Sequence, residues 1–295
     1  MNKSFTLIEI LVVIVIIGII SAFIIVSMAG VSDKARIAKS QAFSNSLKNS
    51  LMLNLISEWR LDDASGTTAQ DHWGTNNGAW SGAGGGAYTS PSWRTSSECV
   101  SGGCLAFDGT DDYVNCGSNI AIGLNSFTFS FWAKTSVNNT LKTAIKRLAA
   151  ITGWVGAFEV PHSGTRNAIF YITDGNYSVG SIYRYMEPHT NNSNTTDNKW
   201  HYFVGACDRS QHKAPDVYLD GILKNGASSG YCDQLTDDIP LGLLYIGGTS
   251  GYFNGLIDDV RIYNAAIPSS QIQQNYYLGL NQLLINNGIA FKEYQ

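Results

Sequence analysis

The chain opens with a long apolar segment that strongly limits what its first part can form. From Ile10 to Ala29 there is no charged residue, and about 20 such residues suffice for a helix to cross a ~30 Å hydrocarbon core. A secretory signal has a shorter apolar region that ends at a small-residue cleavage site. Here a short polar leader, residues 1–4, precedes the apolar run. The sequence therefore predicts a helix whose transmembrane half covers about residues 5–29.

The residues around the start of this segment carry a family resemblance. The small residue Ser4 is followed by Phe5, and Glu9 is the first charged residue after them. This pattern closely resembles the class III signal of type IV pilins, pseudopilins and related filament subunits, which usually have Gly where this chain has Ser4. The resemblance implies that a prepilin peptidase cuts between Ser4 and Phe5 and that Phe5 is N-methylated. It further implies a precursor in the cytoplasmic membrane, then an extracellular filament of pilin-like subunits with the head outside.

Glu9 has two interpretations. A carboxylate in the first turn of a membrane helix is costly unless it meets a cation. The resemblance implies that Glu9 pairs with the free amine of Phe5 on a neighbouring subunit, which would make both residues part of filament assembly. The alternative is that the Glu9 carboxylate only reaches the lipid headgroups.

Composition separates the rest of the chain from nucleic-acid-binding proteins. The formal net charge is −4, so no basic surface argues for nucleic acid as a partner. Charged residues make up 14% of the chain, aromatic residues make up 12%, and there are 30 glycines. This composition favours many short strands joined by turns.

The residue pattern changes period along the chain. Helix formers continue after the apolar segment, so one helix is predicted over residues 5–54. From Leu55 the period is two; in residues 126–133 it places Phe127, Phe129 and Phe131 on one face. Further strands are predicted at 56–61, 166–173, 180–185, 199–208, 216–220, 243–247 and 255–263, and residues 105–109 with 111–114 are predicted to form a hairpin. A short helix is predicted at 269–276, and residues 278–295 form a C-terminal appendage.

The order of these signals resembles the concanavalin A-like jelly roll of the laminin-G/pentraxin-like group over about residues 55–277. The segments that carry the resemblance are Trp59–Asp62, Leu105–Gly109, Phe129–Trp132, Trp200–His201, Val217–Gly221 and Gly255–Tyr263. The predicted fold class is therefore mainly β, with a long N-terminal α-helix followed by a two-sheet antiparallel jelly-roll sandwich. Alternating side chains fill such a sandwich, and Trp59, Trp132 and Trp200 are predicted in its core.

Such folds host both lectins and glycoside hydrolases, so the site must decide between them. Laminarinase-type hydrolases carry two glutamates on one strand, separated by an aspartate, for a two-carboxylate mechanism. The glutamates after the apolar segment are isolated in sequence, at 58, 98, 159, 187 and 293. Adjacent aspartates occur at 62/63, 111/112, 237/238 and 258/259; in strands they would point to opposite faces. These features favour a head that is not an enzyme.

A lectin-like module for adhesion or carbohydrate binding is the preferred function of the head. The candidate ligand platform consists of tryptophans in Gly-rich loops, Trp73, Trp80, Trp93 and Trp154, whose exposed rings could stack on a surface glycan. The alternative is that these rings cap the sandwich edges. A structural pilin head without a ligand is the rival function, and a glycoside hydrolase ranks third.

The cysteines predict two disulfides, which an exported domain can keep. Cys99 and Cys104 enclose a short loop with two glycines, and Cys207 and Cys232 flank a predicted strand and hairpin. Cys116 is left over and is predicted to be a small buried side chain. A zinc site is disfavoured because no Cys/His cluster has ligand spacing.

A structural Ca²⁺ is implied by the jelly-roll resemblance, on the convex side of the sandwich. Asp258 matches the position whose carboxylate binds this ion in the laminarinase-like branch, and Asp71 is the loop donor predicted to join it. Carboxylate and carbonyl oxygens suit a hard cation. The alternative is that Asp258 only caps backbone amides at a strand end.

Overall fold

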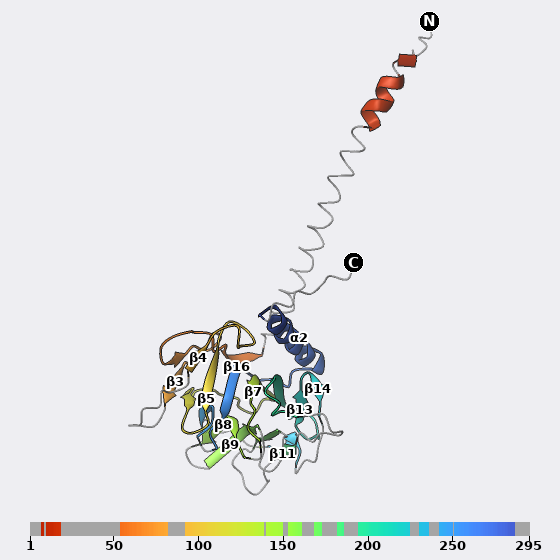
Figure 1. Cartoon of the computed structure of the whole chain (residues 1–295). Helices are drawn as coiled ribbons and strands as arrows, with labels where there is room; N and C mark the ends of the chain where they lie inside the picture. Colours follow the sequence, from red (N-terminus) through yellow and green to blue (C-terminus); the bar gives the residue numbers. More distant parts are fainter. Residues whose placement is uncertain are drawn as a thin grey trace. The chain divides into compact units, whose positions relative to one another are not determined.

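The protein divides into two compact units, Met1–Leu53 and Asn54–Gln295. The structure is a computed structural model that describes residues 7–8, 10–18, 54–81, 92–138, 140–149, 153–160, 168–172, 182–185, 194–224, 230–235, 242–249 and 251–286 (Figure 1). In the first unit, residues 7–8 and 10–18 are helical. The rest of the predicted transmembrane segment lies outside the described residues. Within the described residues, no helix has both the length and the apolar character needed to cross a membrane.

The second unit is built from two antiparallel sheets, as the sequence predicts. Sheet A has the order β14-β13-β12-β7-β16-β5-β4, with β1 also paired to β16, and sheet B has the order β11-β10-β9-β8-β15-β6-β3-β2. The strands of sheet A are β1 (Leu55–Trp59), β4 (Ser92–Arg94), β5 (Cys104–Asp108), β7 (Phe127–Lys134), β12 (Trp200–Cys207), β13 (Asp216–Leu219), β14 (Ile222–Leu223) and β16 (Asn254–Tyr263). Those of sheet B are β2 (Thr68–Ala69), β3 (Gly78–Ser81), β6 (Tyr113–Asn115), β8 (Thr143–Ala149), β9 (Gly153–Glu159), β10 (Ile169–Ile172), β11 (Ile182–Tyr185) and β15 (Gly242–Ile246). A 3-10 turn, η1, covers Cys232–Gln234.

The core lies between the two sheets and is rich in phenylalanine. Phe127, Phe129 and Phe131 on β7 are at most 5% exposed, which confirms the predicted inward face of this strand. Phe131 meets Phe158 of sheet B with ring centroids 5.0 Å apart, and stacks on Phe203 of β12 at 5.2 Å. Burial of apolar surface stabilises a fold by about 25 cal/mol per Å², so these rings are a main source of the stability of the sandwich.

The outer face of sheet A is covered by the helix α2 (Ser269–Asn286). Tyr276 stacks on Trp132 of β7 with ring centroids 5.6 Å apart. A Cβ on residue 279 would lie 2.5 Å from Cζ2 of Trp132, so Gly279 lets the helix approach closely. Trp132 is therefore buried under α2, on the face of β7 opposite to the predicted sandwich core. The helix runs past its predicted end and includes residues 278–286 of the predicted appendage.

Two disulfides fasten the second unit, and both join the predicted pairs. Cys99 is bonded to Cys104, and Cys207 is bonded to Cys232. Cys116 is a free and buried cysteine. The second bond joins the end of β12 to η1, so it ties a loop segment to a central strand of sheet A.

Candidate functional site

Three of the four predicted platform tryptophans have described side chains, and two of these, Trp80 and Trp93, pack together. Trp73 is 48% exposed. Trp80 of β3 and Trp93 of β4 pack against each other and against the core, with ring centroids 5.2 Å apart. Because β3 and β4 lie in different sheets, this pair closes one edge of the sandwich, as the alternative interpretation has it. The side chain of Trp154 lies outside the described residues, as do Ser4, Phe5 and Glu9.

Asp71 organises the loop that follows it. Its Oδ1 accepts hydrogen bonds from the backbone N–H groups of Glu58 at 2.9 Å, Gly74 at 2.8 Å and Trp73 at 3.2 Å, and its Oδ2 accepts one from Asn76 at 3.0 Å. Burial raises the pKa of Asp71, but these amides outweigh burial and hold the pKa below its usual value. Both carboxylate oxygens therefore already serve the backbone.

Asp258 on β16 binds the disulfide loop between Cys99 and Cys104. Its Oδ2 accepts the N–H groups of Val100 at 2.8 Å and Ser101 at 3.1 Å. The side chain is fully buried, and Oδ1 has no hydrogen-bond partner. Burial, together with the neighbouring Asp259 carboxylate, raises the pKa of Asp258 well above its usual value. Calcium binding by Asp258 and Asp71 stays a prediction, and amide capping describes their observed contacts.

A different set of aspartates has the arrangement of a metal site. One oxygen from each of Asp108, Asp111 and Asp112 lies within 4.8 Å of the others. The sequence predicts that adjacent aspartates in a strand point apart, but Asp111 and Asp112 lie in the turn before β6, so the prediction is wrong for this pair. Gly109, with a φ of 84°, helps the turn to reverse.

The electrostatics of this Asp triad favour a bound cation. Oδ2 of Asp112 accepts the N–H of Asp108 at 2.9 Å. Burial and the carboxylates of Asp108 and Asp111 raise the pKa of Asp112 to about 6. Three crowded carboxylates are the donor set that Ca²⁺ prefers, so these residues fit a hard divalent cation.

The outer face of sheet B carries a row of aromatic and charged side chains next to this triad. In β6 and β15, Val114 and Ile246 pair on the inner face, so Tyr113 and Tyr245 are on the outer face. The two tyrosine rings meet edge to face with centroids 5.4 Å apart. Tyr245 is directly opposite Lys146 of β8, and opposite residues of neighbouring strands share a face.

Lys146 gives this row a partly buried cation. Burial lowers the pKa of Lys146, while the charge of Glu159 acts in the opposite direction. Burial also raises the pKa of Tyr245, and Tyr113 adds to this effect. We call Tyr113, Tyr245 and Lys146 the tyrosine–lysine row. The row combines two tyrosine rings, of which Tyr245 is only 9% exposed, with the hydrogen-bond donors of their hydroxyl groups and of the Lys146 ammonium.

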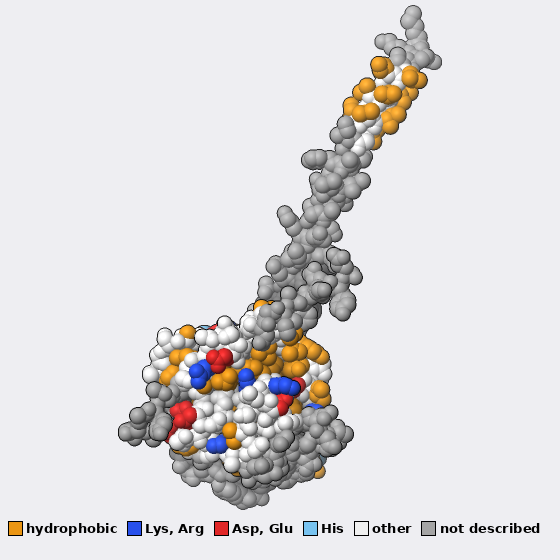
Figure 2. Space-filling model, viewed as in Figure 1, with side chains coloured by type: hydrophobic (Ala, Val, Ile, Leu, Met, Phe, Trp, Pro, Cys, Tyr) orange, Lys and Arg blue, Asp and Glu red, His pale blue; other side chains and the backbone are white. Residues whose placement is uncertain are grey.

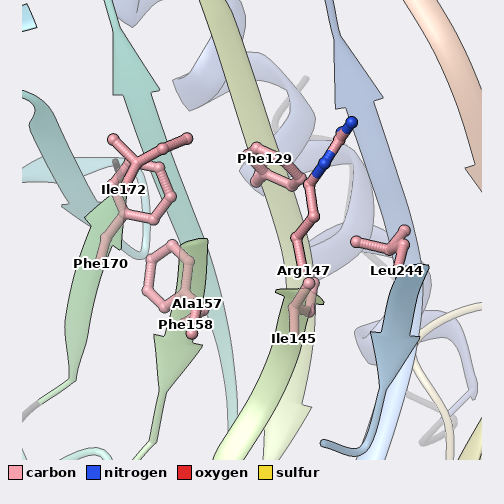
Figure 3. Close-up of a pocket in the computed structure, with 8 residues that line it drawn as sticks. All are labelled: Phe129, Ile145, Arg147, Ala157, Phe158, Phe170, Ile172 and Leu244. Carbon is pink, nitrogen blue, oxygen red and sulfur yellow. The ribbon is translucent and has the colours of Figure 1, made fainter. Parts of the chain in front are cut away.

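The described part of the core contains a small cavity. A cavity of about 10 Å³ lies between the sheets and is lined by Phe129, Ile145, Arg147, Ala157, Phe158, Phe170, Ile172 and Leu244 (Figure 3). Arg147 rises between Phe129 and Leu244 and donates to the carbonyl of Ile120 at 2.7 Å. A cavity of this size holds about one water molecule, so it is part of the core and not a sugar site.

Glu58 and Glu159 lie in different sheets. Glu58 on β1 of sheet A pairs with Arg261 at 2.8 Å and with Arg60 at 3.0 Å, whereas Glu159 is on β9 of sheet B. Burial raises the pKa of Glu58, but the two guanidinium groups outweigh it and hold the pKa low. A general acid needs a raised pKa, so Glu58 has a structural role.

Two family models match parts of this chain. The model of the concanavalin A-like lectin/glucanases superfamily matches residues 108–273. The chain belongs to this superfamily. The model of the prokaryotic N-terminal methylation motif matches residues 1–25 of the same chain, as the resemblance of the first residues predicts. No curated protein matches the sequence.

Solved structures share the concanavalin A-like fold at low sequence identity. The binding domain of Paraclostridial Mosquitocidal Protein 1 is 15% identical, with a TM-score of 0.57, over 77% of this chain and 52% of that one. Domain 4 of AbnA, an extracellular arabinanase from Geobacillus stearothermophilus in complex with arabinotriose, is 16% identical, with a TM-score of 0.52, over 75% of this chain and 97% of that one.

A third structure is from botulinum neurotoxin type C, whose cell entry depends on interaction with two ganglioside molecules. It is 14% identical, with a TM-score of 0.55, over 79% of this chain and 53% of that one. The chain thus spans about half the length of the two toxin structures. At these identities the likeness shows the fold alone.

The tyrosine–lysine row was not predicted from the sequence of the concanavalin A-like domain. Tyr113 alternates with buried Val114, and this alternation assigns it to an outer face, whereas Tyr245 is 9% exposed and shows no such signal. Their meeting depends on the pairing of β6 with β15, whose residues are far apart in the chain.

Proposed function

We propose that this protein is a type IV pilin-like surface filament subunit that displays a non-catalytic, lectin-like head for adhesion. The observation that carries the proposal is the presence of an N-terminal methylation motif and a concanavalin A-like domain on one chain. The motif implies processing by prepilin peptidase and assembly with other pilin-like subunits. The two disulfides suit a head outside the cytoplasm.

The tyrosine–lysine row is the proposed carbohydrate-binding surface. Aromatic rings pack against the apolar faces of sugar rings, and the Lys146 ammonium can donate to hydroxyl groups. The complex of the AbnA domain with arabinotriose and the ganglioside interaction of the type C neurotoxin support carbohydrate as the ligand class.

A glycan array with the fragment Asn54–Gln295, which is a compact unit with its own core, tests the lectin role. Binding to a defined set of glycans supports the proposal. Silence on every glycan favours a structural head without a ligand, and release of reducing sugar would mean that the head is a glycosidase. N-terminal mass spectrometry of sheared surface filaments tests the subunit role, which an intact Met1 would contradict.

A structural Ca²⁺ is a second part of the proposal. The Asp triad is its favoured location, because it combines three carboxylates with a raised pKa at Asp112. Bound there, the ion would supply positive charge that keeps all three carboxylates ionised and holds the β5–β6 turn. Asp71 and Asp258 are the alternative ligands.

A further inference from the structure

We propose that His201 acts as a pH-dependent switch: with both ring nitrogens protonated it holds residues 197–199 against the start of β12, and in its neutral form it releases them. His201 is the second residue of β12, and residues 197–199 form a bend directly before this strand. We call these three residues the 197–199 bend. This role of His201 goes beyond the proposed function and does not depend on it.

The imidazole of His201 lies between two carboxylates. Its Nδ1 is 2.8 Å from Oδ2 of Asp220, and its Nε2 is 3.1 Å from Oδ1 of Asp197. An imidazolium ion has an N–H on both nitrogens, whereas a neutral imidazole has an N–H on one nitrogen and a lone pair on the other. Both contacts are therefore hydrogen bonds only while the ring is charged. A neutral ring would place a lone pair against a carboxylate oxygen.

The surroundings of His201 make the loss of a contact costly. Its side chain is 15% exposed, so water cannot readily replace a lost hydrogen bond. Ala133 is opposite His201 on β7 and carries no charge, while Lys134 lies on the other face of the sheet. Charged side chains form a few small groups on the face of the head drawn in Figure 2. The meeting of one imidazole with two carboxylates therefore concentrates ionisable groups at one site.

Electrostatics set the direction of the switch. Burial lowers the pKa of His201, but the hydrogen bonds and charges of Asp220 and Asp197 outweigh burial and raise the pKa above its usual value. Burial raises the pKa of Asp197, but the contacts and charges of His201 and Lys199 outweigh it and hold the pKa low. The charged ring is therefore lost as pH rises through its raised pKa, while Asp197 stays ionised through that change.

Asp220 is fixed to β12 and so keeps its contact with His201. Its Oδ1 accepts the N–H of Tyr202 at 2.9 Å, and its own N–H donates to the carbonyl of Tyr202 at 2.9 Å. Burial and the charge of Asp220 raise the pKa of Tyr276, so Asp220 also lies near α2. A neutral His201 that keeps its proton on Nδ1 preserves the bond to Asp220 and directs its lone pair at Asp197.

The 197–199 bend is held less firmly than Asp220. Asp197 accepts the N–H of Lys199 at 2.9 Å and pairs with its ammonium at 3.5 Å, and both contacts lie within the bend. Asn198 has a φ of 62°, in the left-handed region that is unfavourable for residues other than glycine. The N–H of Asn198 donates to the carbonyl of Thr135 at 3.0 Å, which joins the bend to β7. Loss of the His201 contact therefore leaves a strained bend with a weaker attachment.

An NMR titration of the isotope-labelled fragment Asn54–Gln295 from about pH 5 to about pH 9 tests the switch. The ring signals of His201 report its charge and the nitrogen that keeps the proton. We expect Nδ1 to keep it, and the amide signals of Asn198 and Lys199 to shift with the midpoint of His201. Above that midpoint, exchange of the Asn198 amide should rise roughly 10-fold beyond its intrinsic increase with pH.

Two comparisons serve as controls. His212 is paired with Asp233 at 2.8 Å and has a side chain that is 67% exposed, so its titration should leave the 197–199 bend unchanged. In Asp197→Asn, the amide can accept from the charged ring through its oxygen and donate to the neutral ring through its nitrogen. This variant should therefore keep the bend in place at both ends of the titration.

Amide signals of the 197–199 bend that stay constant while His201 titrates would overturn this inference. A ring that stays charged up to about pH 9 would also overturn it. So would a neutral ring with its proton on Nε2, because Asp220 would then be the released partner. If the bend in Asp197→Asn moves with pH as it does in the wild type, another group controls it and His201 is not the switch. The wild-type titration decides the question even if Asp197→Asn does not fold.

Discussion

Tyr276 of α2 and Trp132 of β7 stack at 5.6 Å with an angle of 17° between their rings. Trp132 also contacts Tyr202 of β12 at 5.2 Å. Three aromatic rings thus join a C-terminal helix to two central strands of sheet A. This contact packs α2 against sheet A, so the helix is part of the head and its outer side forms part of the surface of the head.

Tyr276→Ala should lower the free energy of unfolding of the fragment Asn54–Gln295 by about 2 kcal/mol, because it removes a stacked ring from a buried contact. The matched control is Tyr277→Ala, since Tyr277 is 64% exposed and should change stability by less than about 0.5 kcal/mol. Urea unfolding followed by tryptophan fluorescence measures both. Equal effects would mean that α2 does not dock through Tyr276.

Tyr245→Ala should weaken binding to any glycan that the wild-type head binds, because it removes one ring of the tyrosine–lysine row and its support for Tyr113. A loss of roughly 10-fold or more in affinity corresponds to about 1.4 kcal/mol. Tyr231→Ala is the control, because Tyr231 is 42% exposed beside η1. Isothermal titration calorimetry measures both affinities, and retained binding by Tyr245→Ala would place the site elsewhere.

Asp112→Asn should stabilise the head at neutral pH in the presence of a chelator. In the folded wild type the pKa of Asp112 is raised to about 6. The fold therefore favours the protonated carboxyl group, and the resulting stabilisation is complete below the unfolded pKa and is lost as pH rises through about 6. The variant should gain about 1 kcal/mol at pH 7 and show a flatter melting curve against pH. Scanning calorimetry between acid and neutral pH measures this change.

Calcium should raise the melting temperature of the wild type but not of Asp112→Asn, if the ion binds the Asp triad. Asp258→Asn is the informative companion variant. A calcium shift that survives in Asp112→Asn and disappears in Asp258→Asn would instead support the site predicted from the sequence. No shift in the wild type would mean that neither site binds calcium.

His201 should give the head a second pH-dependent contribution to stability, in the same direction as that of Asp112. Its Nδ1 is 2.8 Å from Oδ2 of Asp220 and its Nε2 is 3.1 Å from Oδ1 of Asp197. Burial lowers the pKa of His201, but the hydrogen bonds and charges of the two aspartates outweigh it and raise the pKa above its usual value. Its stabilising effect is therefore complete below the unfolded pKa and is lost as pH rises through the folded pKa.

The test is to replace the imidazole. His201→Gln should lose about 1 kcal/mol at pH 6 and less at pH 8, as measured by thermal melts. His212→Gln is the control, because His212 is paired with Asp233 but has a side chain that is 67% exposed, where such pairs contribute little. The prediction fails if the two variants show the same pH dependence.

The sequence by itself determined the elements whose signals are local. The alternation of Phe127, Phe129 and Phe131 follows from the two-residue period of a strand, and the buried rings agree with it. The N-terminal motif is a linear pattern that a peptidase reads along the chain, so it needs no fold to be recognised. The disulfide partners Cys99 and Cys104 are close in sequence, and the short loop with two glycines between them favoured their pairing.

The tertiary structure decided everything that depends on which distant strands become neighbours. Tyr113 and Tyr245 meet only because β15 pairs with β6, and Trp80 meets Trp93 only because the two sheets close at one edge. Asp111 and Asp112 converge with Asp108 because they lie in a turn, where the alternation of a strand no longer applies. The direction of a side chain is set by the local period of the backbone, which can be predicted from one sequence. Contacts across strands depend on the order of the strands in the sheets, which a single sequence does not reveal directly.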